Sequence, residues 1–167
     1  QSAKTCTDQQ LTFLDFFEDN DRVVVKGPAG TGKTLIAVEA LRRHKIIEPN
    51  STVAFFCFNK LLGEELRREC QSLGSTAAVG SFHRWMQSLI ENPRAPVTSE
   101  YWEKILPSAV IDLLHSVGGT VDFLILDEAQ DLLIEERYLE VFDLLLKGGL
   151  KKGRYLFLGD FQRQNIY

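Results

Sequence analysis

Short apolar runs and longer amphipathic segments alternate along the chain. Five runs are dense in aliphatic, β-branched and aromatic residues and have the length of buried strands, at 22–26, 52–58, 77–81, 121–126 and 154–160. Elsewhere apolar residues recur at helical spacing, at 8–17, 33–44, 61–68, 100–117 and 135–147, and another helix begins near 82. Pro107 is expected to kink or split the helix at 100–117. The alternation predicts an α/β fold with a mostly parallel sheet between helices.

Composition fits one globular domain. The 167 residues are 44% hydrophobic and 25% charged, which are ordinary values for a chain with a sizeable core. The formal net charge of −4 argues against a broadly basic nucleic-acid binder, although it leaves room for a local basic groove.

The cysteines and the apolar runs bear on location. Cys6, Cys57 and Cys70 are odd in number and form no C-x-x-C pair, so we expect free thiols in a reducing compartment. No apolar run approaches the length of a membrane span, and the N-terminus lacks a signal region. The sequence therefore predicts a cytoplasmic protein with no membrane contact.

The clearest chemical motif follows the first predicted strand. Residues 27–34 match the phosphate-loop pattern G-x-x-x-x-G-K-[ST] at every fixed position, with a strand before and a helix after. Backbone N–H groups of such a loop and the helix N-terminus face phosphate oxygens. The lysine neutralises phosphate charge, and the threonine hydroxyl binds Mg²⁺. The candidate phosphate-binding residues are Gly27, Pro28, Ala29, Gly30, Thr31, Gly32, Lys33 and Thr34.

Two adjacent carboxylates follow the fourth predicted strand. Asp127 and Glu128 stand at its carboxyl end, where ligands bind in open α/β sheets. In a phosphate-loop enzyme the first acid of such a pair holds Mg²⁺ and the second activates the attacking water. The alternative, an acidic first turn of a helix at 127–131, is disfavoured because the phosphate loop is present.

Weaker signals concern other ends of strands and helices. Phe58 and Lys60 suit a nucleobase and a phosphate, although the residues alone favour a core phenylalanine beside a solvated cap. Ser81 is placed as a helix N-cap, and His83 is either a donor or a structural histidine. A glutamine near the start of the first helix can read an adenine edge or be a solvated cap residue.

The motifs together resemble the first RecA-like motor domain of superfamily 1 helicases, in the UvrD-like branch. Residues 27–34 resemble motif I, F-N-K-L-L from Phe58 resembles motif Ia, and Ser81-Phe82-His83 resembles motif Ib. D-E-A-Q-D at 127–131 matches motif II, and 159–167 resembles motif III. Thr7-x-x-Gln10 resembles the adenine-reading Q motif, which favours Gln10 over Gln9.

The resemblance implies a three-layer RecA-like P-loop NTPase fold and an ATP-dependent DNA helicase or translocase that uses ATP and Mg²⁺. Gln10 would read adenine, and Thr34 with Asp127 would hold Mg²⁺. Lys33 and the base Glu128 would be catalytic, while Gln130 and Gln164 would sense the γ-phosphate. The expected path for single-stranded DNA, with RNA left open, comprises Phe58, Asn59, Lys60, Ser81, Phe82, His83 and Tyr167.

Three departures from the family pattern qualify this picture. Motif III has one residue more before its glutamine, so Gln162 stays an alternative to Gln164. Residues 82–120 leave room only for a reduced, 1B-like helical insertion within a single domain at 1–167. The chain stops at motif III, so a second RecA-like domain is absent from it, and we expect the fragment alone to hydrolyse ATP very slowly. A nucleotide-dependent regulatory switch and a small-molecule phosphate-loop kinase are the competing functions.

Overall fold

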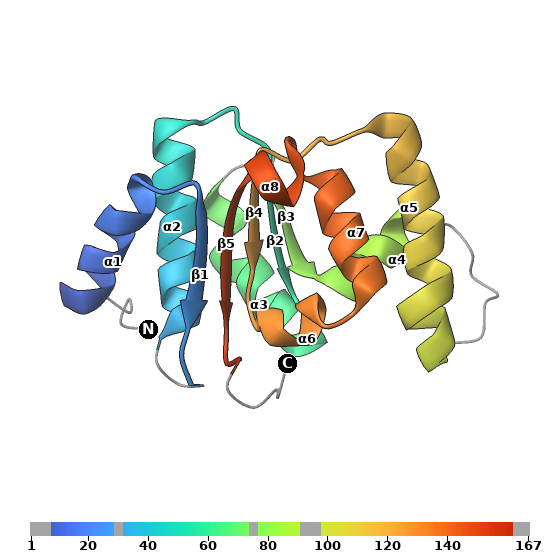
Figure 1. Cartoon of the computed structure of the whole chain (residues 1–167). Helices are drawn as coiled ribbons and strands as arrows, with labels where there is room; N and C mark the ends of the chain where they lie inside the picture. The colour runs from blue at the N-terminus through green and yellow to red at the C-terminus, as the bar shows by residue number, and fades with distance from the viewer. Residues whose placement is uncertain (1–7, 29–31, 74–76, 91–97, 162–167) are drawn as a thin grey trace.

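A parallel five-stranded sheet is the centre of the molecule. The computed structural model describes residues 8–28, 32–73, 77–90 and 98–161. The strands are β1 (Arg22–Lys26), β2 (Val53–Cys57), β3 (Ala77–Ser81), β4 (Phe123–Leu126) and β5 (Arg154–Gly159). They lie in the order β1-β5-β4-β2-β3, with every neighbouring pair parallel. All the carboxyl ends therefore meet at one edge of the sheet, the lower edge in Figure 1.

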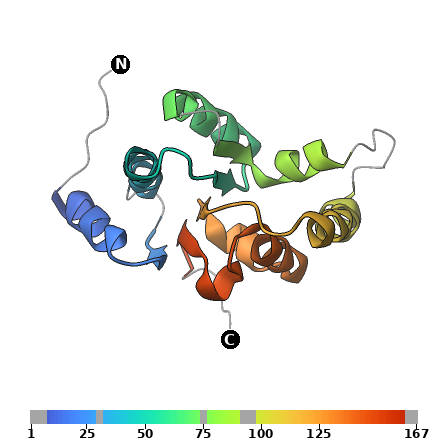
Figure 2. The ribbon, with the colours of Figure 1, turned by 90° about the horizontal axis from the view of Figure 1, so that it is seen from above.

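Helices cover both faces of this sheet (Figure 2). On one face lie α1 (Asp8–Glu18), α2 (Lys33–Ile47) and α3 (Lys60–Glu69). On the other lie α4 (Phe82–Leu89), α5 (Leu106–Val117), α6 (Ala129–Leu133) and α7 (Glu136–Leu145). Three short helices complete the described chain: η1 (Gln71–Leu73), the π-helix η2 (Tyr101–Ile105) and α8 (Gly149–Lys152). The arrangement confirms the predicted three-layer α/β fold with a parallel sheet between helices.

Alternate strand residues feed two separate cores. In β2, Phe55 points to the core beneath α1, α2 and α3, whereas Phe56 points to the core beneath α4, α5 and α7. Both rings are almost completely buried. Strands buried on both faces lose the alternation of apolar and polar residues, which is why these segments read as continuous apolar runs.

The long helix predicted at 100–117 contains a local defect. Residues 101–105 form a π-helix, in which the Leu106 N–H donates to the carbonyl oxygen of Tyr101, five residues earlier. Pro107 follows directly, and it lacks an N–H and crowds the preceding turn, so the defect has the cause that the sequence suggested. A π-helical turn holds one residue more than an α-helical turn, so residues 101–105 are rotated about the helix axis relative to α5. Ile105 is therefore 55% exposed, although its spacing matched the buried stripe.

Small elements near the ends of strands escaped prediction. Helices α6 and α8 have only five and four residues, too few to show a helical pattern of their own in the sequence. Strand β4 begins at Phe123, and Val121 makes only an isolated bridge to Leu146. Among the described residues, no helix has the length and apolarity needed to cross a membrane.

Candidate functional site

The phosphate loop begins at the carboxyl end of β1. The Gly27 N–H donates to the carbonyl oxygen of Gly159 over 3.1 Å, so the start of the loop is attached to the end of β5. Gly32, with φ of 80°, precedes the first turn of α2. The predicted contacts Ala29, Gly30 and Thr31 lie outside the described residues.

Lys33 turns back onto the loop. Its side chain is buried, and its Nζ donates to the carbonyl oxygens of Gly27 at 2.8 Å and Pro28 at 2.6 Å. The amide of Gln10 lies so close to Gly32 that a side-chain carbon at Gly32 would collide with Nε2. Helix α1 therefore brings Gln10 to the phosphate loop.

Thr34 and Asp127 meet at the centre of the candidate site. The Thr34 hydroxyl donates to Oδ2 of Asp127 over 2.7 Å, although 93 residues separate them in the chain. Asp127 is fully buried, and its own N–H donates to the carbonyl oxygen of Phe56. Burial raises the pKa of Asp127, while hydrogen bonds from Thr34 and from the Glu128 N–H lower it. The pair presents a hydroxyl and a carboxylate oxygen, which are ligands that Mg²⁺ accepts.

Glu128 stands in a special backbone conformation beside this pair. It is the one non-glycine with positive φ, 49°, among the residues that the structure describes. Its Oε2 accepts a 2.6 Å hydrogen bond from Nε2 of Gln130, whose Oε1 accepts from the Asp160 N–H at 3.1 Å. A side chain at Gly159 would collide with that Oε1. Gln130 thus connects the second carboxylate to the end of β5.

A second group of candidate residues lines a hollow of about 450 Å³ at the ends of β2 and β3. Phe58 is 45% exposed, and its ring meets the His83 ring edge-on at 5.1 Å between centroids. Nε2 of His83 lies 2.8 Å from the Tyr138 hydroxyl, which donates to the carbonyl oxygen of Trp102. Burial lowers the pKa of His83 and is the largest of the causes that raise the pKa of Tyr138. The hollow therefore has an aromatic wall that is uncharged at neutral pH.

Three of the predicted nucleic-acid contacts have structural roles in the fold. Phe82 is fully buried and packs between Tyr138 and Phe142, so the prediction that it lines the nucleic-acid path is wrong. Oδ1 of Asn59 accepts hydrogen bonds from two N–H groups in the first turn of α3, which makes it a helix cap. Ser81 also caps a helix, through a 3.4 Å bond from the Arg84 N–H, and it lines the hollow together with Lys60.

Gln164, its alternative Gln162, and Tyr167 lie outside the described residues. Trp102 and Tyr138 line the hollow but were read as parts of the buried faces of helices. The available signal was Pro107, since a π-helix before it changes the face on which Trp102 lies.

Cys57, near Asp127, has its pKa raised to about 12, chiefly by burial, and is an inert thiol.

Comparison with known proteins places this architecture in a family. No curated protein matches the chain. A solved structure concerning DNA unwinding at forked dsDNA by two coordinating Pif1 helicases aligns at 16% identity with a TM-score of 0.47. That alignment covers 94% of this chain and 34% of the other, so the chain spans about a third of that protein's length. The model of the Schlafen group 3 DNA/RNA helicase domain matches residues 20–143, well over half of the chain, which therefore belongs to this family.

Proposed function

We propose that the chain is the ATP-binding motor domain of a superfamily 1 helicase of the UvrD-like branch, which couples ATP hydrolysis to movement along single-stranded nucleic acid. The contact between the Thr34 hydroxyl and the Asp127 carboxylate carries the proposal. It joins a phosphate-loop residue to an acidic strand end, and these two groups bind Mg²⁺ in phosphate-loop enzymes. Membership of a helicase-domain family supports the same function.

The donor set suits Mg²⁺ bound together with a nucleotide. No group of three or more His, Cys, Asp or Glu residues arranged to hold a metal is found in the described part of the chain. One carboxylate and one hydroxyl nevertheless fit Mg²⁺, which commonly takes its other ligands from water and phosphates. When bound, the ion supplies positive charge beside the β- and γ-phosphates. Thr34 and Asp127 would hold it there.

Lys33 and Gln10 would position the nucleotide. The Lys33 ammonium now lies on two loop carbonyls, within reach of the loop that cradles phosphates. Phosphate oxygens are stronger acceptors than carbonyls, so we expect ATP to draw Lys33 toward the β- and γ-phosphates. Gln10, beside Gly32, would donate to and accept from the adenine edge, which favours ATP over GTP.

Glu128 would act as the base in hydrolysis. Its carboxylate would take a proton from the water that attacks the γ-phosphorus, while the bond to the ADP oxygen breaks. The hydrogen bond from Gln130 holds the Glu128 carboxylate, and the other end of the same amide is bonded to Asp160. A movement at the end of β5 would therefore reach the base through one side chain. This connection supports a role in coupling hydrolysis to movement.

The hollow beside Phe58 and His83 would receive the nucleic acid. Its exposed Phe58 ring offers a stacking surface, and Lys60 offers a positive charge for a phosphate. Because the pKa of His83 is lowered, the imidazole would act there as a neutral hydrogen-bonding ring and not as a cation. Tyr167 and Gln164 remain proposed contacts to the strand and to the γ-phosphate.

ATP hydrolysis by the full-length protein tests the proposal. We expect hydrolysis to depend on Mg²⁺, to rise strongly when an oligothymidylate is added, and to be lost in Asp127→Asn. Glu136→Gln, an exposed carboxylate on α7, is the control and should leave the rate unchanged. Equal hydrolysis with and without nucleic acid would favour a regulatory switch. Phosphate transfer to a small acceptor would favour a kinase.

A further inference from the structure

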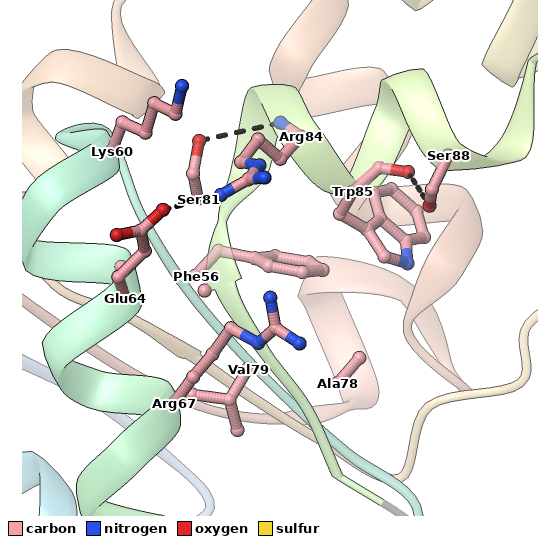
Figure 3. A pocket seen from close by; sticks show the side chains of 12 residues that line it. Phe56, Lys60, Glu64, Arg67, Ala78, Val79, Ser81, Arg84, Trp85 and Ser88 are labelled. Atoms are coloured by element: carbon pink, nitrogen blue, oxygen red, sulfur yellow. Dashed lines mark hydrogen bonds and ion pairs between the residues drawn. The ribbon is translucent and has the colours of Figure 1, made fainter.

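The outer edge of the sheet carries a second hollow, continuous with the first. Strand β3 is the edge strand, and the hollow beside it has a volume of about 400 Å³ between α3 and α4. Figure 3 shows Glu64 and Arg67 reaching from α3 and Arg84 from α4, with Lys60 at the upper rim and Trp85 along the other side. Lys60, Ser81 and Arg84 line both hollows. The two therefore share a rim.

The side chain of Arg67 packs against the edge strand at Gly80. Its Cδ and Cγ lie where a side chain on Gly80 would be, 3.1 Å and 3.4 Å from the ideal Cβ position. Gly80 has φ of 140°, a conformation that other residues adopt only with strain. A glycine at this position thus leaves the space in which the Arg67 stem lies. The guanidinium points from α3 into the hollow (Figure 3).

The positive charges in the hollow are only partly neutralised. Among the residues that the structure describes, the side chains of Lys60 and Arg67 have no hydrogen-bond or ion-pair partner. Arg84 is paired with Glu64, at 2.8 Å between Nη1 and Oε1, and both side chains are largely exposed. Arg68 and Gln71 extend the same surface beyond Arg67. Three basic groups against one acid make this a local positive surface on a chain of net charge −4.

We infer that this groove along β3, lined by Lys60, Arg67 and Arg84, binds the sugar-phosphate backbone of single-stranded nucleic acid. The inference rests on the proposed function and extends its strand path from the hollow at Phe58 down the side of the domain. Arg67 is the main unpaired cation that can donate hydrogen bonds to a phosphate. Arg84 stays paired with Glu64 until a phosphate takes the place of the Glu64 carboxylate.

The geometry favours nucleic acid over an extended peptide that pairs with β3. A peptide added to the sheet needs a regular row of backbone donors and acceptors on the edge strand. The positive φ at Gly80 departs from the regular extended backbone that such pairing favours, and the Arg67 stem lies against the same residue. A phosphate backbone needs only separated cations, and bases can stack on the Trp85 indole. The shared rim at Lys60 also makes one strand able to occupy both hollows.

Opposite changes at Arg67 and Glu64 test the groove. The full-length protein would be titrated with a fluorescent oligothymidylate long enough to cover both hollows, at several salt concentrations. Arg67→Gln keeps most of the stem and removes the charge. We expect about fourfold weaker binding at ~0.15 M salt, with the slope of log K against log salt smaller by about 0.7, the value of one phosphate contact on a single strand. Arg67→Lys should keep the slope, and Glu64→Gln should tighten binding.

Two comparisons separate the possible failures. Lys151→Ala removes an exposed charge from α8, away from the groove, and should leave affinity and slope unchanged. If Phe58→Ala weakens binding while Arg67→Gln behaves like Lys151→Ala, the groove proposal is overturned and the motor proposal stands. If the unaltered protein does not bind oligothymidylate, both proposals are overturned.

Discussion

The two halves of the sheet's carboxyl edge are built on opposite principles. At the ends of β1, β4 and β5, buried and half-buried polar side chains are bonded within the site: Thr34 to Asp127, Glu128 to Gln130, and Lys33 to loop carbonyls. At the ends of β2 and β3, Phe58 and the basic side chains of Lys60, Arg67 and Arg84 are exposed, and the other aromatic side chains that line the hollows are half-buried or buried. Phe58 is 45% exposed, whereas Asp127 is fully buried.

This difference fits two kinds of ligand. Chemistry on a phosphate needs groups fixed to within fractions of an ångström, and fixed groups need neighbours that hold them. Binding a strand of any sequence needs only stacking surfaces and positive charges, which tolerate small displacements. We therefore expect substitutions in the first region to affect turnover steeply, and substitutions in the second to affect nucleic-acid affinity moderately.

The largest effect is expected at Glu128. Glu128→Gln removes the proposed base but leaves Asp127 and Thr34 in place, so ATP should still bind while the turnover number falls by about 10²–10⁴. Steady-state hydrolysis and calorimetric ATP binding measure the two properties separately. Affinity for oligothymidylate should not change, because Glu128 does not line the hollow at Phe58. If Glu128→Gln keeps the turnover number of the unaltered protein, Glu128 is not the catalytic base.

Phe58 gives the corresponding test in the second region. Phe58→Ala should weaken oligothymidylate binding by about 1–3 kcal/mol, the usual value of one base stacked on an aromatic ring. ATP affinity without nucleic acid should stay the same, and fluorescence anisotropy with calorimetry would measure both.

Phe16 is the matched control for this change. Phe16 is 57% exposed on α1, which lies beside the β1 end of the sheet, whereas β3 forms the other end (Figure 1). Phe16→Ala should therefore leave nucleic-acid binding unchanged. If both substitutions weaken binding equally, the loss is not specific to the hollow, and the assignment of Phe58 fails.

The contrast between the regions also explains what the sequence was able to predict. The phosphate loop, Asp127 and Glu128 follow local rules, because each motif needs a short run of residues after a strand. Their meeting across 93 residues follows from parallel strands that end at one edge. The Gln130 bridge to Asp160 depends on side-chain orientation, which local pattern does not specify.

In the second region local pattern was a poorer guide. Phe58 and Phe82 both follow a strand and both are aromatic, yet one is exposed and the other is fully buried. Tertiary packing separates them, because Phe82 lies against several aromatic rings, among them Tyr138 and Phe142. Arg67 had no motif at all, since its position depends on Gly80, thirteen residues away on another element. The helicase class was nevertheless predicted correctly, because it rests on the motifs of the first region.

The smallest effect is expected from the histidine in the second hollow. Burial lowers the pKa of His83 below its ordinary value of 6.5, so the unfolded chain takes up a proton at a higher pH than the folded chain does. The stabilisation from neutral His83 is therefore complete above pH 6.5 and is lost as the pH falls below it. His44, whose pKa is also lowered chiefly by burial, adds a loss of the same sign. Asp127 acts in the opposite sense, because a raised carboxyl pKa favours the folded state at low pH.

Comparing His83→Gln with the unaltered protein isolates the His83 contribution, since His44 and Asp127 are common to both. Urea unfolding followed by circular dichroism, at pH values above and below 6.5, should give a free energy of unfolding that falls less on acidification in the variant than in the unaltered protein. His115→Gln changes an exposed histidine on α5 and should not alter how far the free energy of unfolding decreases on acidification. Identical pH profiles for His83→Gln and the unaltered protein would mean that the ring takes up its proton as easily in the hollow as in water. The Phe58 hollow would then be as wet as the surface, and the division between a neutral aromatic wall and a basic groove would not hold.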